Sequence, residues 1–175
     1  MRLFAAICFD EGAAEKFIKI QKDLLKMGKG RFTAEDALHL TLAFLGEIPE
    51  DLVPAVRDAM RSVYMQPMSL KIARVGTFSE SKGLWWAGIE GNRNLNDLQA
   101  GIAAALDNAG VRFQKEKYSP HVTLVRGFVK SSSFDAKKAL KKPFEVKADS
   151  FCLMRSDLTK DGAVYTAVER YNASL

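Results

Sequence analysis

A four-residue pattern, His-x-Thr-Leu, occurs twice in this chain and uses both of its histidines. The copies are His39-Leu40-Thr41-Leu42 and His121-Val122-Thr123-Leu124. Each lies in an apolar run that favours a strand, over 38–45 and 120–128. Because side chains alternate between the faces of a strand, each His shares a face with its Thr, and the Leu side, which includes Phe44 in the first copy, is expected to face the core. Two such polar faces predict the walls of one cleft.

The two copies belong to a longer repeat with a fixed shift of 82 positions (121 minus 39). The same shift carries Ile7 onto Ile89, Ala5 onto Ala87, Ile20 onto Ile102, Leu24 onto Leu106 and Gly28 onto Gly110. Strand, helix, glycine and motif strand recur in this register without gaps, which is typical of an internal duplication. We therefore expect one domain over residues 1–175, with two β-α-β-α lobes related by a pseudo-two-fold axis.

Hydrophobic periodicity predicts the other elements. Further strands are expected over 2–9, 70–75, 84–90, 144–154 and 163–171, and helices over 13–27, 52–63, 95–106 and 131–142. Gly28 and Gly30 are read as the end of the first helix, and residues 31–33 as a crossing to the first motif strand.

Composition limits the possible functions. The chain has 175 residues, is 47% hydrophobic and carries a net charge of +5, which suits one domain with a sizeable core and a phosphate-bearing partner. Cys8 and Cys152 fall in predicted strands and are expected to be buried thiols in a reducing compartment, without the spacing of a zinc site. No apolar run resembles a signal peptide or a membrane span, so a cytoplasmic enzyme or binding protein is expected.

Paired imidazoles indicate general acid–base chemistry. An imidazole titrates near pH 6.5, so one His can accept a proton from water while the other protonates a leaving oxygen. A Thr hydroxyl on the same face can donate to a phosphate oxygen. This set fits an in-line displacement at phosphorus, and a strained cyclic phosphodiester would need no metal. The alternative for each His is a hydrogen-bonded core residue.

The motifs resemble those of the two-histidine phosphoesterase superfamily, and most closely those of bacterial and archaeal RNA 2′,3′-cyclic phosphodiesterases, also called 2′-5′ RNA ligases. The resemblance rests on His39-Leu40-Thr41-Leu42-Ala43-Phe44-Leu45-Gly46 and Ser119-Pro120-His121-Val122-Thr123-Leu124-Val125-Arg126. Supporting matches are 2–7, 30–32, 86–90 and 162–165.

The resemblance implies an α+β fold of two pseudo-symmetric lobes, each an antiparallel-type sheet with helices packed outside, facing across a central cleft. It also implies metal-independent hydrolysis of an RNA or nucleotide 2′,3′-cyclic phosphate to a 2′-phosphomonoester by a monomer without a cofactor. By position, His39 would be the proton donor and His121 the proton acceptor. Thr41, Thr123 and Arg126 would bind the phosphate.

Two positions depart from the family pattern. Many relatives carry Lys where this chain has Ala43, which strand alternation places on the His/Thr face, and often Trp where it has Phe32. Arg126 poses a geometric question, because it lies five positions after His121 and a regular strand would turn it to the Leu124 side. A strand bulge, a place at the strand end or a surface role are the alternatives.

Several further side chains are candidates for substrate contact. Phe32, Tyr118 and Phe128 flank the motif strands, and Phe44 lies within the first, so each could contact a base, with core or rim packing as the alternative. Trp85 and Trp86 should face opposite sides, one towards the core. The basic run 137–142 is interpreted as a solvated surface rather than an RNA track, whereas Lys115 and Lys117 are better placed. Tyr165 could form a hydrogen bond near the cleft.

Other functions stay open on the sequence alone. The same chemistry could act on a small cyclic nucleotide, an ADP-ribose cyclic phosphate or a 2′-5′ oligoadenylate. The cleft could instead belong to a nucleotide- or RNA-binding module without catalysis. RNA ligation through a 2′-5′ bond would be the same acid–base reaction run in reverse. The RNA substrate and the oligomeric state are not fixed by the sequence.

Overall fold

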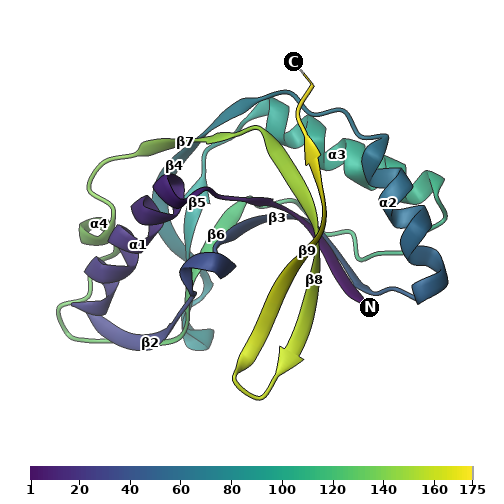
Figure 1. The fold of residues 1–175 in the computed structure, drawn as a ribbon. Coiled ribbons are helices and arrows are strands. Elements are labelled where there is room, and N and C mark those ends of the chain that lie inside the picture. The colour runs from purple at the N-terminus through teal and green to yellow at the C-terminus, as the bar shows by residue number, and fades with distance from the viewer. Residues whose placement is uncertain (175) are drawn as a thin grey trace.

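A computed structural model describes residues 1–174 (Figure 1). Its strands are β1 (Arg2–Cys8), β2 (Gly28–Phe32), β3 (His39–Glu47), β4 (Met68–Ser79), β5 (Leu84–Ile89), β6 (His121–Lys130), β7 (Phe144–Ala148), β8 (Ser150–Thr159) and β9 (Gly162–Asn172). Its helices are α1 (Glu11–Leu25), α2 (Val53–Arg61), α3 (Arg93–Asn108) and α4 (Ala136–Ala139). The predicted α+β class with antiparallel strands is confirmed.

One antiparallel sheet contains all the strands of the described residues, in the order β7-β4-β5-β6-β3-β1-β8-β9. The two motif strands, β3 and β6, lie at its centre and meet in the antiparallel pair Leu40–Val122. Strand β2 pairs with the later part of β6. The two lobes are therefore halves of one continuous sheet, joined where the two motifs meet.

The two halves of the sheet have the same strand order when each is followed from its outer edge to the centre and repeated strands are treated as equivalent. Shifted by 82 positions, β1, α1, β3 and β4 start at residues 84, 93, 121 and 150, which are the first residues of β5, α3, β6 and β8. Strand β4 of the first half pairs with β5 of the second, and β8 of the second half pairs with β1 of the first. Each half is completed by a strand from the other. This arrangement supports our proposal of a single domain made by duplication.

The two motif strands also share an irregularity. Leu42 and Ala43 are both buried in β3, as are Leu124 and Val125 in β6, and the pairing with the neighbouring strand shifts at these points. An extra residue in a strand reverses the faces of the residues that follow it. Phe44 and Arg126 therefore turn to the side of the His and Thr residues.

This bulge corrects one prediction from strand alternation. Ala43 is only 7% exposed, whereas Phe44 is 39% exposed, so Phe44 and not Ala43 follows His39 and Thr41 on the open face. For Arg126, the bulge is the alternative that the structure adopts.

Strand β2 is missing from the sequence prediction, which read its glycines only as the end of a helix. A Cβ atom at Gly28 would overlap Phe128, and one at Gly30 would overlap Val125. Glycine is needed here because the backbone of β2 approaches these side chains of β6 closely.

Two predicted elements near the C-terminus also differ. Residues 144–154 form two strands, β7 and β8, which pair with β4 and β1 in different halves of the sheet. The helix expected over 131–142 is reduced to α4, since in that helix only Ala139 is buried. A lysine-rich segment with so little apolar surface has no buried face to stabilise a longer helix.

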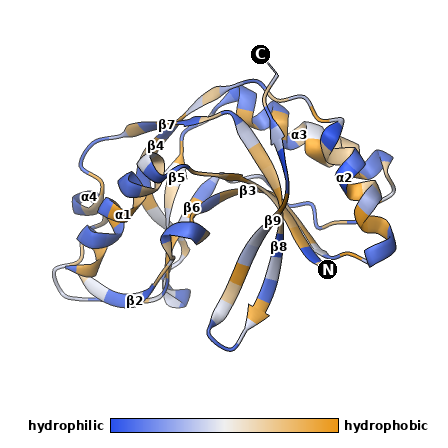
Figure 2. Ribbon diagram, viewed as in Figure 1, coloured by the Kyte–Doolittle hydropathy of each residue, from blue (hydrophilic) through white to orange (hydrophobic). Residues whose placement is uncertain are grey.

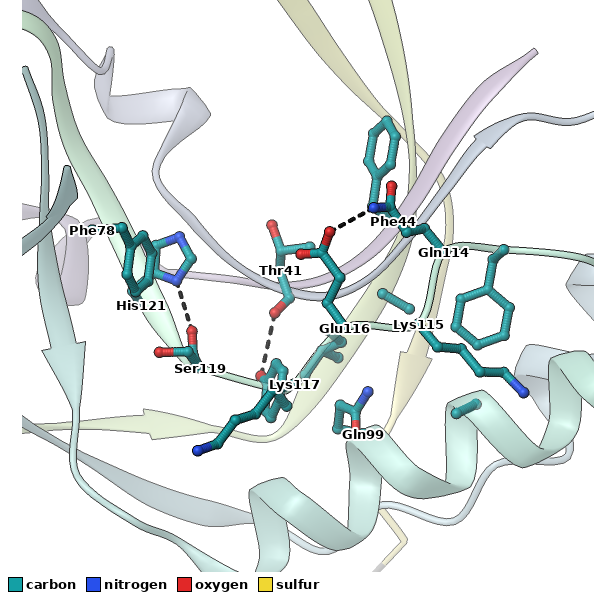
Figure 3. A pocket seen from close by; sticks show the side chains of 15 residues that line it. Thr41, Phe44, Phe78, Gln99, Gln114, Lys115, Glu116, Lys117, Ser119 and His121 are labelled. Atoms are coloured by element: carbon teal, nitrogen blue, oxygen red, sulfur yellow. Dashed lines mark hydrogen bonds between the residues drawn. The ribbon is translucent and has the colours of Figure 1, made fainter. Parts of the chain in front are cut away.

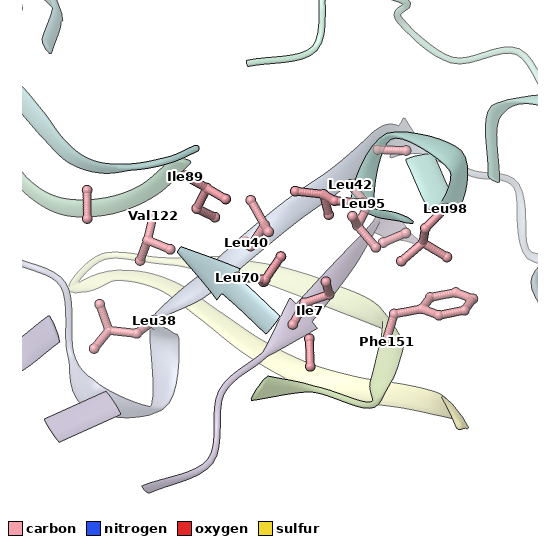
Figure 4. Close-up of a cluster of buried hydrophobic side chains, with 14 of the residues drawn as sticks. Ile7, Leu38, Leu40, Leu42, Leu70, Ile89, Leu95, Leu98, Val122 and Phe151 are labelled. Atoms are coloured by element: carbon pink, nitrogen blue, oxygen red, sulfur yellow. The ribbon is translucent and has the colours of Figure 1, made fainter. Parts of the chain in front are cut away.

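The helices cover the sheet in two pairs, α1 with α4 and α2 with α3. The mixed blue and orange ribbons of α1, α2 and α3 in Figure 2 show amphipathic helices that bury one face. Leu40 and Val122, from the meeting point of the motifs, lie in one buried cluster with Leu95 and Leu98 of α3 (Figure 4). The predicted core faces of both motif strands are buried as expected as far as Leu42 and Leu124. Within residues 1–174, no helix is long and apolar enough to cross a bilayer.

Candidate active site

A pocket of about 380 Å³ brings the two motifs together on the open face of the sheet. Its lining residues are Arg2, Phe4, His39, Thr41, Phe44, His121, Thr123, Arg126, Ser156, Leu158, Ala163 and Tyr165. Both histidines and both threonines lie in it, together with the predicted Arg126. We call it the two-histidine pocket.

The central strand pair sets the relation between the two motifs. Because Leu40 lies opposite Val122 in an antiparallel pair, the register places His39 beside Thr123 and Thr41 beside His121. Each imidazole therefore lies next to the threonine of the other motif. A group bound between the strands meets one His and one Thr from each half.

The two imidazoles are held in the same way. His39 Nδ1 lies 2.7 Å from the carbonyl oxygen of Ala37, and His121 Nδ1 lies 2.7 Å from that of Ser119. A carbonyl can only accept, so each Nδ1 carries the hydrogen and each Nε2 is left to exchange a proton. His39 Nε2 lies 3.1 Å from Thr41 Oγ1.

Aromatic rings pack against both imidazoles. The His39 ring centroid lies 5.0 Å from that of Phe4 and 5.2 Å from that of Tyr165. The His121 centroid lies 4.9 Å from that of Phe78 and 6.2 Å from that of Trp86. These contacts restrict the orientation of both imidazole rings.

The charges of the two-histidine pocket favour an anion. Arg2 and Arg126 line it, and none of the described residues that line it is Asp or Glu. The Arg2 guanidinium stacks 4.9 Å from the Phe44 ring centre, and its buried Nε has no partner among the described residues. Nor do the described residues contain a cluster of three His, Cys, Asp or Glu side chains able to hold a metal ion.

Burial lowers the pKa of His39 below its ordinary value. The hydrogen bond to Ala37 opposes this, while the positive charge of Arg126 and the neighbouring His121 lower the pKa further. These surroundings favour a neutral His39. A bound anion would offset the charge of Arg126 and favour the protonated form.

A second and larger pocket, of about 610 Å³, adjoins the first and shares Thr41, Phe44 and His121 with it. We call it the side pocket. It lies between β3, α3 and the segment 111–120, and Figure 3 shows Phe44 and His121 at different ends of it. Tyr118 lines it and donates a hydrogen bond of 3.2 Å to the carbonyl of Thr41. Lys115 and Lys117 line it as well.

The remaining aromatic candidates are divided between site and core. Phe44 and Tyr118 line pockets, whereas Phe32 and Phe128 line neither and pack against each other with ring centroids 6.3 Å apart. Tyr165 lines the two-histidine pocket.

The tryptophans, basic run and cysteines can also be placed. Trp85 and Trp86 are both 5% exposed and face different neighbours, Trp85 against Phe134 and Trp86 beneath His121. The lysines of the run 137–142 are absent from both pocket linings. Cys152 is buried and Cys8 is half-buried, and both are free thiols.

Sequence reasoning assigned no site role to several lining residues. Arg2 and Phe4 could have been found from strand alternation, because they share a face of β1, the strand that pairs with β3. Leu158 and Ala163 come from the hairpin of β8 and β9, and Gln99 and Phe113 line the side pocket. No local pattern in the sequence marks these four residues.

Comparison with known proteins identifies the family of the chain. A family model described as the 2′-5′ RNA ligase superfamily matches residues 14–160. This chain belongs to the 2′-5′ RNA ligase superfamily. In this member of the superfamily, the two motif strands meet at the centre of one sheet.

Superfamily relatives match along almost the whole chain. A Methanocaldococcus jannaschii protein named RNA 2′,3′-cyclic phosphodiesterase is 32% identical over 182 residues, covering 98% of this chain and 100% of that protein. The crystal structure of TT0787 of Thermus thermophilus has 25% identity and a TM-score of 0.80, covering 98% and 97% of the two chains. Escherichia coli LigT complexed with phosphate has 26% identity and a TM-score of 0.76, covering 99% and 98%.

Proposed function

We propose that this protein hydrolyses the 2′,3′-cyclic phosphodiester at an RNA end to a 2′-phosphomonoester, with His39 and His121 as the acid–base pair. One observation carries the proposal. Two imidazoles, each fixed through Nδ1 by a 2.7 Å bond to a backbone carbonyl, share one pocket that is lined by two arginines. The name of the archaeal relative and the phosphate complex of the E. coli protein support the choice of substrate.

The reaction uses the Nε2 atom of each imidazole, since both Nδ1 atoms are bonded to backbone carbonyls. His121 accepts a proton from a water molecule as its oxygen bonds to phosphorus, and the bond from phosphorus to the 3′ oxygen breaks. His39 gives its Nε2 proton to that oxygen. Each proton transfer contributes roughly 10²- to 10⁴-fold to the rate. Thr41, Thr123 and Arg126 hold the non-bridging oxygens, where negative charge collects.

The protonation state of His39 is linked to the substrate. Burial and the nearby Arg126 lower the pKa of His39, yet a proton donor must start protonated. The negative phosphate lies between His39 and Arg126 in this proposal and raises that pKa again. Binding of the substrate thus prepares the acid. An RNA 5′-hydroxyl that replaces water would give a 2′-5′ joined product by the same steps.

The test is product analysis on an RNA oligonucleotide with a 2′,3′-cyclic phosphate, in EDTA. We expect a 2′-phosphomonoester and a bell-shaped pH profile. H39A and H121A should each lose roughly 10²- to 10⁴-fold in kcat. Full activity in either variant would reject the mechanism. A 3′-phosphate product would mean that the other ester bond breaks, and dependence on added metal would reject the metal-free step.

A further inference from the structure

The side pocket lies where the pseudo-symmetry fails. In the first half, residues 28–32 form β2 and pair along β6. The equivalent residues after a shift of 82 are 110–114, and the structure assigns no strand between residues 109 and 120. The edge of β3 at Thr41 to Phe44, which corresponds to the part of β6 near β2, lines the side pocket instead.

Different anchors explain this difference. In the first half, the buried Gln21 donates to the carbonyls of Thr33 and Leu124, at 2.8 and 2.9 Å, and holds the chain against β6. The residue 82 positions on is Ala103, which has no amide and lines the side pocket.

The carbonyls of Thr123 and Thr41, related by the same shift, also have unlike donors. Thr33 Oγ1 donates to the first at 2.9 Å, whereas the longer Tyr118 side chain donates to the second at 3.2 Å. Burial raises the pKa of Tyr118, which keeps its phenol protonated as a donor. A long side chain in place of a short one holds segment 111–120 away from β3.

The lining of the side pocket suits a nucleoside. Phe44 and Phe113 offer ring faces for stacking, and the amide of Gln99 can both donate and accept at a base edge, whereas the Gln114 amide already donates to the Glu116 carboxylate. Lys115, Glu116 and Lys117 also line the pocket. Lys115 Nζ pairs with Asp107 at 2.6 Å, so among the described residues Lys117 is the lysine of this lining without a salt bridge, and it would meet a backbone phosphate with positive charge. A volume of about 610 Å³ is within the usual range for small-molecule sites.

The position of the side pocket indicates whether its nucleoside carries the nucleophile or the leaving oxygen. It is lined by His121 and not by His39. In-line displacement places the nucleophile and the leaving oxygen on opposite sides of phosphorus, so groups on the side of the base accompany the nucleophile. We propose that the side pocket binds the 5′-terminal nucleoside of a second RNA strand, whose 5′-hydroxyl takes the place of water. The proposal rests on the proposed function of the two-histidine pocket.

The proposed step is balanced without a co-reactant. The 5′ oxygen bonds to phosphorus, and its proton moves to His121 Nε2. The bond between phosphorus and the 3′ oxygen breaks, and His39 gives that oxygen a proton. The product is a 2′-5′ phosphodiester with a free 3′-hydroxyl.

The experiment measures how the cyclic end divides between water and a 5′-hydroxyl oligonucleotide. We expect the ratio of joined to hydrolysed product to rise with the concentration of that oligonucleotide and to saturate. A103F fills the side pocket and should lower the saturating ratio at least tenfold. A104F, one position along on the exposed face of α3, should leave it unchanged. K117A, on the exposed segment, should lower the ratio at low salt, compared with K138A on the distant basic run.

The possible outcomes separate the two proposals. Hydrolysis without joining, a ratio that rises without saturation, or equal ratios in A103F and A104F would overturn the side-pocket assignment alone. If A103F instead weakened the hydrolysis of a cyclic oligonucleotide but not that of a cyclic mononucleotide, the pocket would hold the preceding nucleotide, and the assignment would be wrong. If the wild-type protein opened no cyclic ester, the proposed function would fail and this assignment with it.

Discussion

The His39 half and the His121 half of the site are alike in their motif strands and differ in the segments that lead into those strands. Both motif strands carry the same bulge, and both imidazoles bond through Nδ1 to the carbonyl two residues earlier, at 2.7 Å. The segments that lead into the motifs differ, since one contains β2 and the other passes around the side pocket.

This difference explains how the two halves of a duplicated fold can take the separate roles of acid and base. The repeated strands supply two equivalent bases, and equivalence alone would not distinguish an acid from a base. Asymmetry enters through groups that are not repeated. Arg126 lies near His39 at a position where the other half has Phe44, and Ala103 stands where the first half has Gln21.

The largest loss of activity is expected when both imidazoles are removed. If His39 and His121 act in the same step, the double variant H39A/H121A should lose about as much activity as the worse single variant, roughly 10²- to 10⁴-fold in kcat. Single-turnover rates on the cyclic-phosphate oligonucleotide measure this without interference from product release. Losses that multiply in the double variant would mean that the two residues act in separate steps.

Much of this site could be predicted from the sequence because it depends on short-range patterns. The His-x-Thr spacing places each pair on one face of a strand, and the constant shift of 82 positions relates the two strands. Both histidines, both threonines and Arg126 lie in one pocket. The apolar alternation likewise identified the buried sides of both motif strands as far as Leu42 and Leu124.

The rest depends on contacts between distant segments. A bulge at Leu42 is visible only in the pairing with β1, so strand alternation exchanged the faces of Ala43 and Phe44. Gly28 and Gly30 carry no apolar pattern, and the strand they form is set by Val125 and Phe128, far along the chain. The side pocket could not be predicted because it results from a strand that one half lacks.

Removing Arg126 tests how an unrepeated charge makes His39 different from His121. The guanidinium lowers the pKa of His39, so R126A should raise that pKa, and loss of a charge-assisted hydrogen bond should reduce kcat/KM about ten- to a hundredfold. The chain has only two histidines, and NMR titration of their ring protons measures the shift directly. R93A removes an arginine that is 93% exposed on α3 and should leave the His39 titration unchanged.

The same variant tests which histidine is the acid. A proton donor sets the alkaline limb of the kcat/KM profile, and a proton acceptor sets the acidic limb. With His39 as donor, the raised pKa in R126A moves the alkaline limb to higher pH. Movement of the acidic limb instead would assign His39 as the base and reverse the roles proposed above.

The smallest effect is expected from Gln21, the residue that closes the first half. Q21L removes two buried hydrogen bonds and leaves the carbonyls of Thr33 and Leu124 without this donor, so we expect a loss of about 1–3 kcal/mol in the free energy of unfolding. Q99L makes the same change on α3, where the half-buried side chain lines the side pocket, and should cost less than about 0.5 kcal/mol. Urea denaturation of both variants measures the difference. Equal losses would mean that Gln21 does not hold the closed half together, and that another cause must explain why the second half is open.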